Sequence, residues 1–235
     1  MKKFIKLELK RTDFHAYVLA TFIIALIMLG FLYLFAYVPK LEPNDADIVI
    51  FTEYKTLIPL YSVLNMAIFC VLAAVIYTKL IIGEYSGKRS ILLFSYPVSR
   101  KKIMLSKLCI VYCFTLISMA TSNIIIFCIF GTTEKIMPLV HEHFTFSIML
   151  QAIETTLIMS FIAASIGVIA VGIGFIKKSV PVTIISAVIM ASLMCNIVLS
   201  ATSSKIILYI LMVSVLCISL IFSANLMKKV DVMEI

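Results

Sequence analysis

Residues 83–90 read GEYSGKRS, and glycines followed by lysine and serine could bind the phosphates of a nucleotide. A P-loop has the pattern GxxxxGK[ST], in which backbone N–H groups surround the phosphates and the last hydroxyl binds Mg²⁺. Here three residues separate Gly83 from Gly87, and Arg89 follows Lys88 where the hydroxyl residue is needed. A long apolar segment, not a buried strand, comes before the loop. The sequence therefore excludes nucleotide binding at this loop.

The triplet His141-Glu142-His143 carries side chains that can bind a metal ion. On an extended segment the two histidines would point to the same side, but no third and fourth ligand lie within reach in the sequence. The alternative is a polar loop outside the membrane. Neither this triplet nor any other Glu/His pair forms the HExxH pattern of a zinc protease. We expect no metal site.

Glu154 is the acidic residue that lies well inside an apolar block. A charge inside a membrane helix is costly, and it usually faces the protein interior or a water path. A role in gating or in the substrate path follows from this position. The alternative is a role at the membrane interface or in helix pairing, since the residue lies about two turns into its block.

The composition of the chain places these residues in membrane helices. The 235 residues are 63% hydrophobic and 14% charged, with a mean hydropathy of +1.14, whereas soluble domains carry about 25% charged residues. A membrane span needs roughly 20 apolar residues. Six blocks are long enough, near residues 16–38, 57–82, 103–130, 147–175, 179–200 and 205–227. The sequence predicts an all-α integral membrane protein with a single domain over residues 1–235.

The basic residues are unevenly divided between the connections. Sixteen of the 20 lie in the N-terminal segment, in residues 79–107, at Lys177-Lys178 and at Lys228-Lys229. These segments all lie on one side of the membrane if the six blocks cross it. Basic residues favour the cytoplasmic side of a membrane. We therefore expect both termini to be cytoplasmic. The net charge of +8 reflects this topology, so no nucleic-acid partner is expected.

Two cytoplasmic segments carry apolar residues that are too few to span. Residues 1–14 place lysines on one side of a helix and apolar residues on the other, which is typical of a helix in the membrane interface; a basic flank that sets orientation is the alternative. In residues 84–100, the run Ser90–Phe94 predicts a short helix, and Pro97 ends it. Such a helix can dock on a soluble partner or on the membrane surface.

The second segment resembles a known pattern. Glu84, Ser86-Gly87, Leu92-Leu93, Tyr96-Pro97-Val98-Ser99-Arg100 and Lys107 are similar to the motif of bacterial ABC-2 type transporter permeases. The number of spans, the cytoplasmic termini and the N-terminal interfacial helix also fit this type V exporter-like fold. The sequence departs from better-known members between spans five and six, where only residues 201–205 join the two helices.

The resemblance implies a transport subunit of the bacterial cell membrane without catalysis of its own. Residues 84–100 would be the coupling helix, seated in a cleft of a separate ABC ATPase. Two permease chains, identical or different, would work with two ATPase chains, and ATP and Mg²⁺ would bind to the ATPase. The interface residues implied in this way are Glu84, Leu92, Leu93, Tyr96, Pro97 and Arg100.

The cargo is inferred from what the spans lack. They show no polar substrate pocket, which favours an amphipathic or hydrophobic cargo. With its short connection between spans five and six, the compact chain is similar to permeases for bacteriocin or lantibiotic immunity and for antimicrobial-peptide or drug efflux. One alternative is an immunity or sensor protein that sequesters a toxin without transport. A membrane enzyme is the other alternative.

Overall fold

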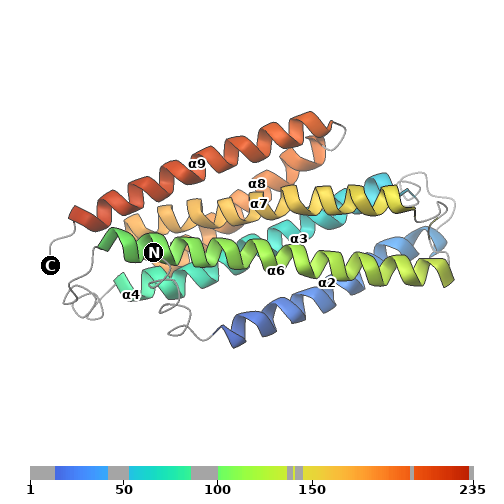
Figure 1. Ribbon diagram of the computed structural model, residues 1–235, viewed down its shortest axis with the longest axis horizontal. Coiled ribbons are helices and arrows are strands. Elements are labelled where there is room, and N and C mark those ends of the chain that lie inside the picture. The colour runs from blue at the N-terminus through green and yellow to red at the C-terminus, as the bar shows by residue number, and fades with distance from the viewer. Residues whose placement is uncertain are drawn as a thin grey trace.

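The computed structural model describes residues 14–41, 53–85, 100–136, 140, 145–201 and 204–232. These residues form long helices (Figure 1). The elements are α2 (His15–Leu41), α3 (Tyr54–Tyr77), the π-helical turn η2 (Thr78–Ile82), α4 (Gly83–Tyr85), α6 (Arg100–Ile136), α7 (Phe146–Lys177), α8 (Val180–Ala201) and α9 (Lys205–Val232). Six helical segments are long and apolar enough to cross a membrane, with η2 and α4 continuing α3. The predicted all-α fold with six spans is confirmed.

The helices run roughly parallel to one long axis, and their ends define two ends of the bundle. At one end lie α4, the start of α6 and the ends of α7 and α9 (Figure 1). We call this the α4 end. The start of α3, the end of α6 and the start of α7 lie at the opposite end, which we call the far end.

Helix α7 is the centre of the bundle. In its apolar 18-residue stretch 83% of the residues are buried, against 11% in the corresponding stretch of α2, 22% in that of α8 and 17% in that of α9. It packs against α3, α6, α8 and α9. Glycines allow the close approach: a Cβ atom on Gly167 would lie 2.9 Å from the Cβ of Ala73, and one on Gly174 would overlap Oγ1 of Thr183. Small residues at such positions let membrane helices pack closely.

The interior is divided into two main apolar cores with polar residues between them. One core lies toward the far end and includes Leu57 and Phe127. The other extends toward the α4 end and includes Phe69 and Ile162. Between them a polar layer joins α3, α6 and α7, and its four side chains are 0–1% exposed. Its members are Tyr61, Asn65, Asn123 and Thr156.

Hydrogen bonds connect the members of the polar layer. The amide of Asn65 and the hydroxyl of Tyr61 donate to Oδ1 of Asn123, the latter over 3.2 Å. Nδ2 of Asn123 donates to Oγ1 of Thr156 over 3.3 Å. Polar groups without water need partners inside the protein. The layer supplies such partners for Nδ2 of Asn65, both polar atoms of Asn123 and the hydroxyls of Tyr61 and Thr156, from three different helices.

The ends of some helices differ from the predicted spans. We expected the third span to end near residue 130, but α6 continues to Ile136, about 55 Å in all at 1.5 Å per residue. This exceeds the roughly 30 Å of a bilayer core. Beyond the end of the helix, the backbone N–H of Val140 donates a hydrogen bond to the Glu134 carboxylate over 2.7 Å. Residues 131–136 are thus helical where the sequence indicated only a loop.

Helices α7 and α8 are joined by a tight turn, as their adjoining blocks required. Lys178 has a φ of 48° and ends α7 in the left-handed conformation. The N–H of Ser179 reaches back to the carbonyl of Gly174 over 3.3 Å. Pro181 lies in the first turn of α8, where a missing N–H costs little. The predicted interfacial helix over residues 1–14 lies outside the described residues, apart from Phe14.

Candidate functional site

A buried ion pair at the α4 end joins two residues of the sequence motif. Nζ of Lys107 on α6 contacts Oε2 of Glu84 on α4. The lysine side chain is 0% exposed and the glutamate side chain 15% exposed. A buried charge is tolerated only when it is paired and hydrogen-bonded. These two residues therefore depend on each other.

The π-helical turn provides the second partner of the lysine. The Lys107 ammonium donates to the backbone carbonyl of Leu80 over 2.8 Å. Leu80 lies within η2, where the N–H of Gly83 reaches the carbonyl of Thr78, five residues earlier. Single π-helical turns inside α-helices occur frequently at functional sites. Here η2 lies near the end of the second span, and one residue, Gly83, separates it from Glu84.

Aromatic residues extend this site to the neighbouring helices. The Tyr77 hydroxyl donates to the carbonyl of Leu108 over 3.1 Å and so connects α3 with α6. Lys107 Nζ lies 5.8 Å from the ring centre of Tyr85, within the range of a cation–π contact. The Tyr85 ring meets Phe175 of α7 edge to face, with the centroids 5.7 Å apart. The ion pair is thus built into the packing of three helices.

The predicted coupling element is described only at its two ends. Glu84 lies in α4, directly before residues 86–99, and Arg100 is the first residue of α6. The predicted interface residues Leu92, Leu93, Tyr96 and Pro97 lie outside the described residues. Lys107 belongs to the motif, but no role was predicted for it. Its position among apolar residues of the third span was the signal that could have identified it as buried.

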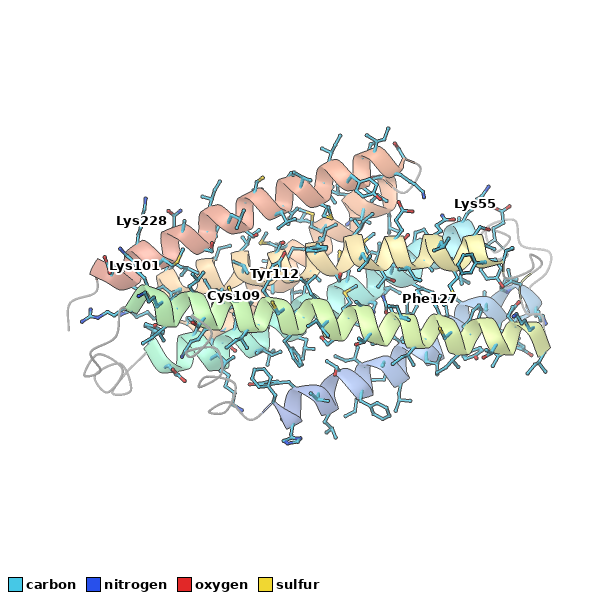
Figure 2. All side chains as sticks on the ribbon, viewed as in Figure 1. Lys55, Lys101, Cys109, Tyr112, Phe127 and Lys228 are labelled. Carbon is cyan, nitrogen blue, oxygen red and sulfur yellow. The ribbon has the colours of Figure 1, made fainter. Side chains whose placement is uncertain are left out.

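The α4 end also carries exposed basic residues. Figure 2 shows Lys101 and Lys228 at this end, and Lys55 at the far end. Nζ of Lys101 lies 2.8 Å from Oδ2 of Asp231, and both side chains are about half exposed. This ion pair joins the start of α6 to the end of α9. Two opposite charges at the surface therefore link α6 to α9 at the α4 end.

Glu154 has two partners on α9. Its Oε2 lies 2.7 Å from Nζ of Lys205, and its Oε1 accepts a hydrogen bond from the Tyr209 hydroxyl over 2.6 Å. The Glu154 side chain is 34% exposed and that of Lys205 is 60% exposed. The contacts agree with the helix-pairing alternative, but the carboxylate still reaches the surface. The sequence did not identify Lys205 and Tyr209 as its partners.

Two further polar residues within the spans were not predicted from the sequence, where Glu154 alone was singled out. Asn65 and Asn123 lie in the middle of α3 and α6 and form the polar layer. Asparagines inside apolar blocks were the available signal. The triplet at 141–143 lies outside the described residues.

The comparisons with known proteins agree with the motif. The chain is 30% identical over 192 residues to YcbO of Bacillus subtilis (strain 168), a protein described as uncharacterized, and the alignment covers 82% of each chain. No solved structure shows significant similarity to this chain. Residues 4–193 match the model of the ABC-2 family transporter protein family. The chain therefore belongs to the ABC-2 family of transporter membrane proteins, as a non-catalytic transport subunit.

Proposed function

We propose that this chain is the permease subunit of an ATP-driven exporter for an amphipathic or hydrophobic cargo. Two permease chains, identical or different, form the translocation path, and two ABC ATPase chains bind ATP and Mg²⁺. The α4 end faces the cytoplasm of a bacterial cell, with both termini on that side. Residues 84–100 receive the movement of the ATPase.

The ion pair of Lys107 and Glu84 carries this proposal. Glu84 precedes the segment 86–99, and Lys107 follows it two turns into α6. Their contact fixes both ends of the coupling element to one point inside the protein. A force on residues 86–99 then acts on α3 and α6 together. A flexible loop without such an anchor would absorb the same displacement.

Packing around the ion pair extends the movement to the rest of the bundle. Tyr85 contacts Phe175 in the last turns of α7. Helix α7 in turn packs against α3, α6, α8 and α9. A displacement at the α4 end therefore reaches the central helix directly. We propose that access to the path alternates through this connection.

The proposed cargo class is an antimicrobial peptide, as in permeases for bacteriocin or lantibiotic immunity. The short connection between α8 and α9, from Ala201 to Lys205, supports a compact permease. The apolar composition of the spans supports a cargo that partitions into the bilayer. Such a cargo can be taken up from the membrane and needs no large polar pocket.

Co-purification with candidate ABC ATPases tests the proposal. We expect the wild-type chain to retain an ATPase, and the variant Leu93→Asp/Tyr96→Asp to lose it, because two carboxylates would enter an apolar contact. Ile136→Asp/Phe146→Asp is the matched control, since these apolar residues are 80% and 75% exposed and lie toward the far end. This control should retain the ATPase.

Two results would contradict the proposal. If the wild type retains no ATPase, sequestration of a toxin without transport becomes the better explanation. If the Leu93→Asp/Tyr96→Asp variant retains the ATPase fully, residues 84–100 are not the coupling element.

A further inference from the structure

The hairpin of α8 and α9 ends short of the far end of the bundle. Figure 1 shows that α6 and α7 extend beyond the junction of α8 and α9 along the long axis. Glu154 is the ninth residue of α7, which starts at Phe146, so it lies about 12 Å along the helix at 1.5 Å per residue. Its contact with Lys205, the first residue of α9, places it level with the end of the hairpin. The carboxylate therefore lies in the outer half of the proposed membrane span.

Apolar side chains flank the carboxylate on both helices. Leu150 and Leu157 lie four residues before and three residues after Glu154, on the same face of α7, and are 52% and 46% exposed. Ile206 and Ile210 of α9 are 71% and 62% exposed. One partly accessible carboxylate thus lies on a pair of helices that also carry exposed apolar side chains. Among the described acidic residues, Glu84 and Glu134 are largely buried, and Glu53 and Asp231 lie at helix ends.

The contacts of Glu154 suit the exchange of one ammonium group for another. Lys205 occupies Oε2 and Tyr209 occupies Oε1. The Lys205 side chain is 60% exposed and belongs to the first residue of α9, so its long chain can leave the carboxylate and extend toward the membrane interface. A ligand ammonium at Oε2 would leave the charge of the site unchanged, and Tyr209 would hold the other oxygen in place.

We propose that Glu154 and Tyr209 form a receptor site for the cationic head group of an amphiphilic cargo, with Lys205 as the competing internal cation. The apolar part of the cargo lies along the exposed leucine and isoleucine side chains beside Glu154. This inference rests on the proposed export function and adds the charge of the cargo to it. A cationic amphiphile in the outer leaflet would then be recognised directly from the membrane.

Binding to the purified permease in nanodiscs of zwitterionic lipid tests the proposal without any ATPase. The probe is dodecylamine, which is charged at neutral pH, and its uncharged N-acetyl derivative is the comparison. Glu154→Gln should weaken dodecylamine binding by about tenfold, which is the loss expected for one charge-assisted hydrogen bond. Lys205→Ala should strengthen it, because the competing ammonium is gone. Glu53→Gln, an exposed acidic residue just before α3, is the control and should change nothing.

The two variants are expected to change dodecylamine binding in opposite directions, and this difference distinguishes a receptor site from a simple link between two helices. If Glu154→Gln and Lys205→Ala both weaken binding, the ion pair only holds α9 in place and the proposal is wrong. Equal effects on dodecylamine and its N-acetyl derivative, or no binding to the wild type, would also overturn it. If the permease still co-purifies with an ATPase in that case, the export function stands and only the cargo charge is refuted.

Discussion

At the scale of single residues, two lysines of α6 that are six positions apart experience opposite environments. Lys107 is 0% exposed and contacts both a carboxylate and a main-chain carbonyl. Lys101 is 51% exposed and pairs with Asp231 at the surface. Exposed ion pairs contribute about 0–1 kcal/mol to stability. Removing one partner of a buried pair costs about 3–5 kcal/mol, because the other charge remains without compensation.

This difference predicts the effect of removing each charge. Lys107→Met should lower the free energy of unfolding by about 3–5 kcal/mol, since the Glu84 carboxylate loses its cation. Lys101→Met should lower it by less than about 1 kcal/mol. Thermal unfolding in one detergent, followed for both variants, measures the difference. Equal shifts would show that Lys107 is not buried in the assembled protein.

The double variant separates stability from function. Lys107→Met/Glu84→Gln removes both charges, so part of the lost stability should return. Coupling should stay lost, because the two ends of residues 86–99 are no longer joined. Full recovery of ATPase-dependent transport in the double variant would exclude the ion pair as the anchor of the coupling element.

At the scale of helices, the polar layer is the feature that joins α3, α6 and α7 specifically. Apolar contacts in a bilayer give little preference for one arrangement, since the lipid is equally apolar, whereas hydrogen bonds between helices require a fixed register. Asn123 contributes to three of these bonds, to Tyr61, Asn65 and Thr156. Such a residue fixes how far each helix can slide or turn against the others.

Asn123→Leu should therefore destabilise the protein by about 1–3 kcal/mol, the cost of buried polar groups left without partners. Asn196→Leu is the matched control, because this asparagine is exposed on α8 and its amide donates to the Ser192 carbonyl of the same helix over 3.0 Å. The control should be neutral. Comparable losses of thermal stability in the two variants would contradict the role of the polar layer.

The spans could be predicted because a bilayer requires long apolar runs, and these are local in the sequence. The end of α6 could not, since its last residues, from Gly131 to Lys135, are mostly polar and continue the helix past the apolar run that a bilayer requires. The pairing of Lys107 with Glu84 joins two residues that lie 23 positions apart in the chain, on different helices. The π-helical turn before Glu84 has no pattern of apolar residues that distinguishes it from an ordinary helix. The motif thus indicated residues 84–100 as the proposed coupling element, but not the ion pair proposed as its anchor.

At the scale of the whole molecule, the charge asymmetry predicts the orientation. Sixteen of the 20 basic residues are assigned to one side, so both termini should be cytoplasmic. A green fluorescent protein fused after residue 235 should fluoresce, and alkaline phosphatase fused at the same point should be inactive. Fusions within residues 42–52 should show the reverse. The opposite pattern would place the coupling element outside the cell and refute the proposed transport mechanism.

The central position of α7 has a consequence for how the protein is made. A chain emerges from the ribosome in order, so α2, α3 and α6 enter the membrane before residues 146–177 exist. Until then the faces of α3 and α6 that later surround α7 lack their partner, and Asn123 lacks Thr156. The nascent first half therefore has to wait in a loose arrangement, and the fourth span must insert between helices already in place. Helices α8 and α9, which also pack against α7, follow it in the chain, so the surroundings of the central helix are complete only when the last two spans have entered the membrane.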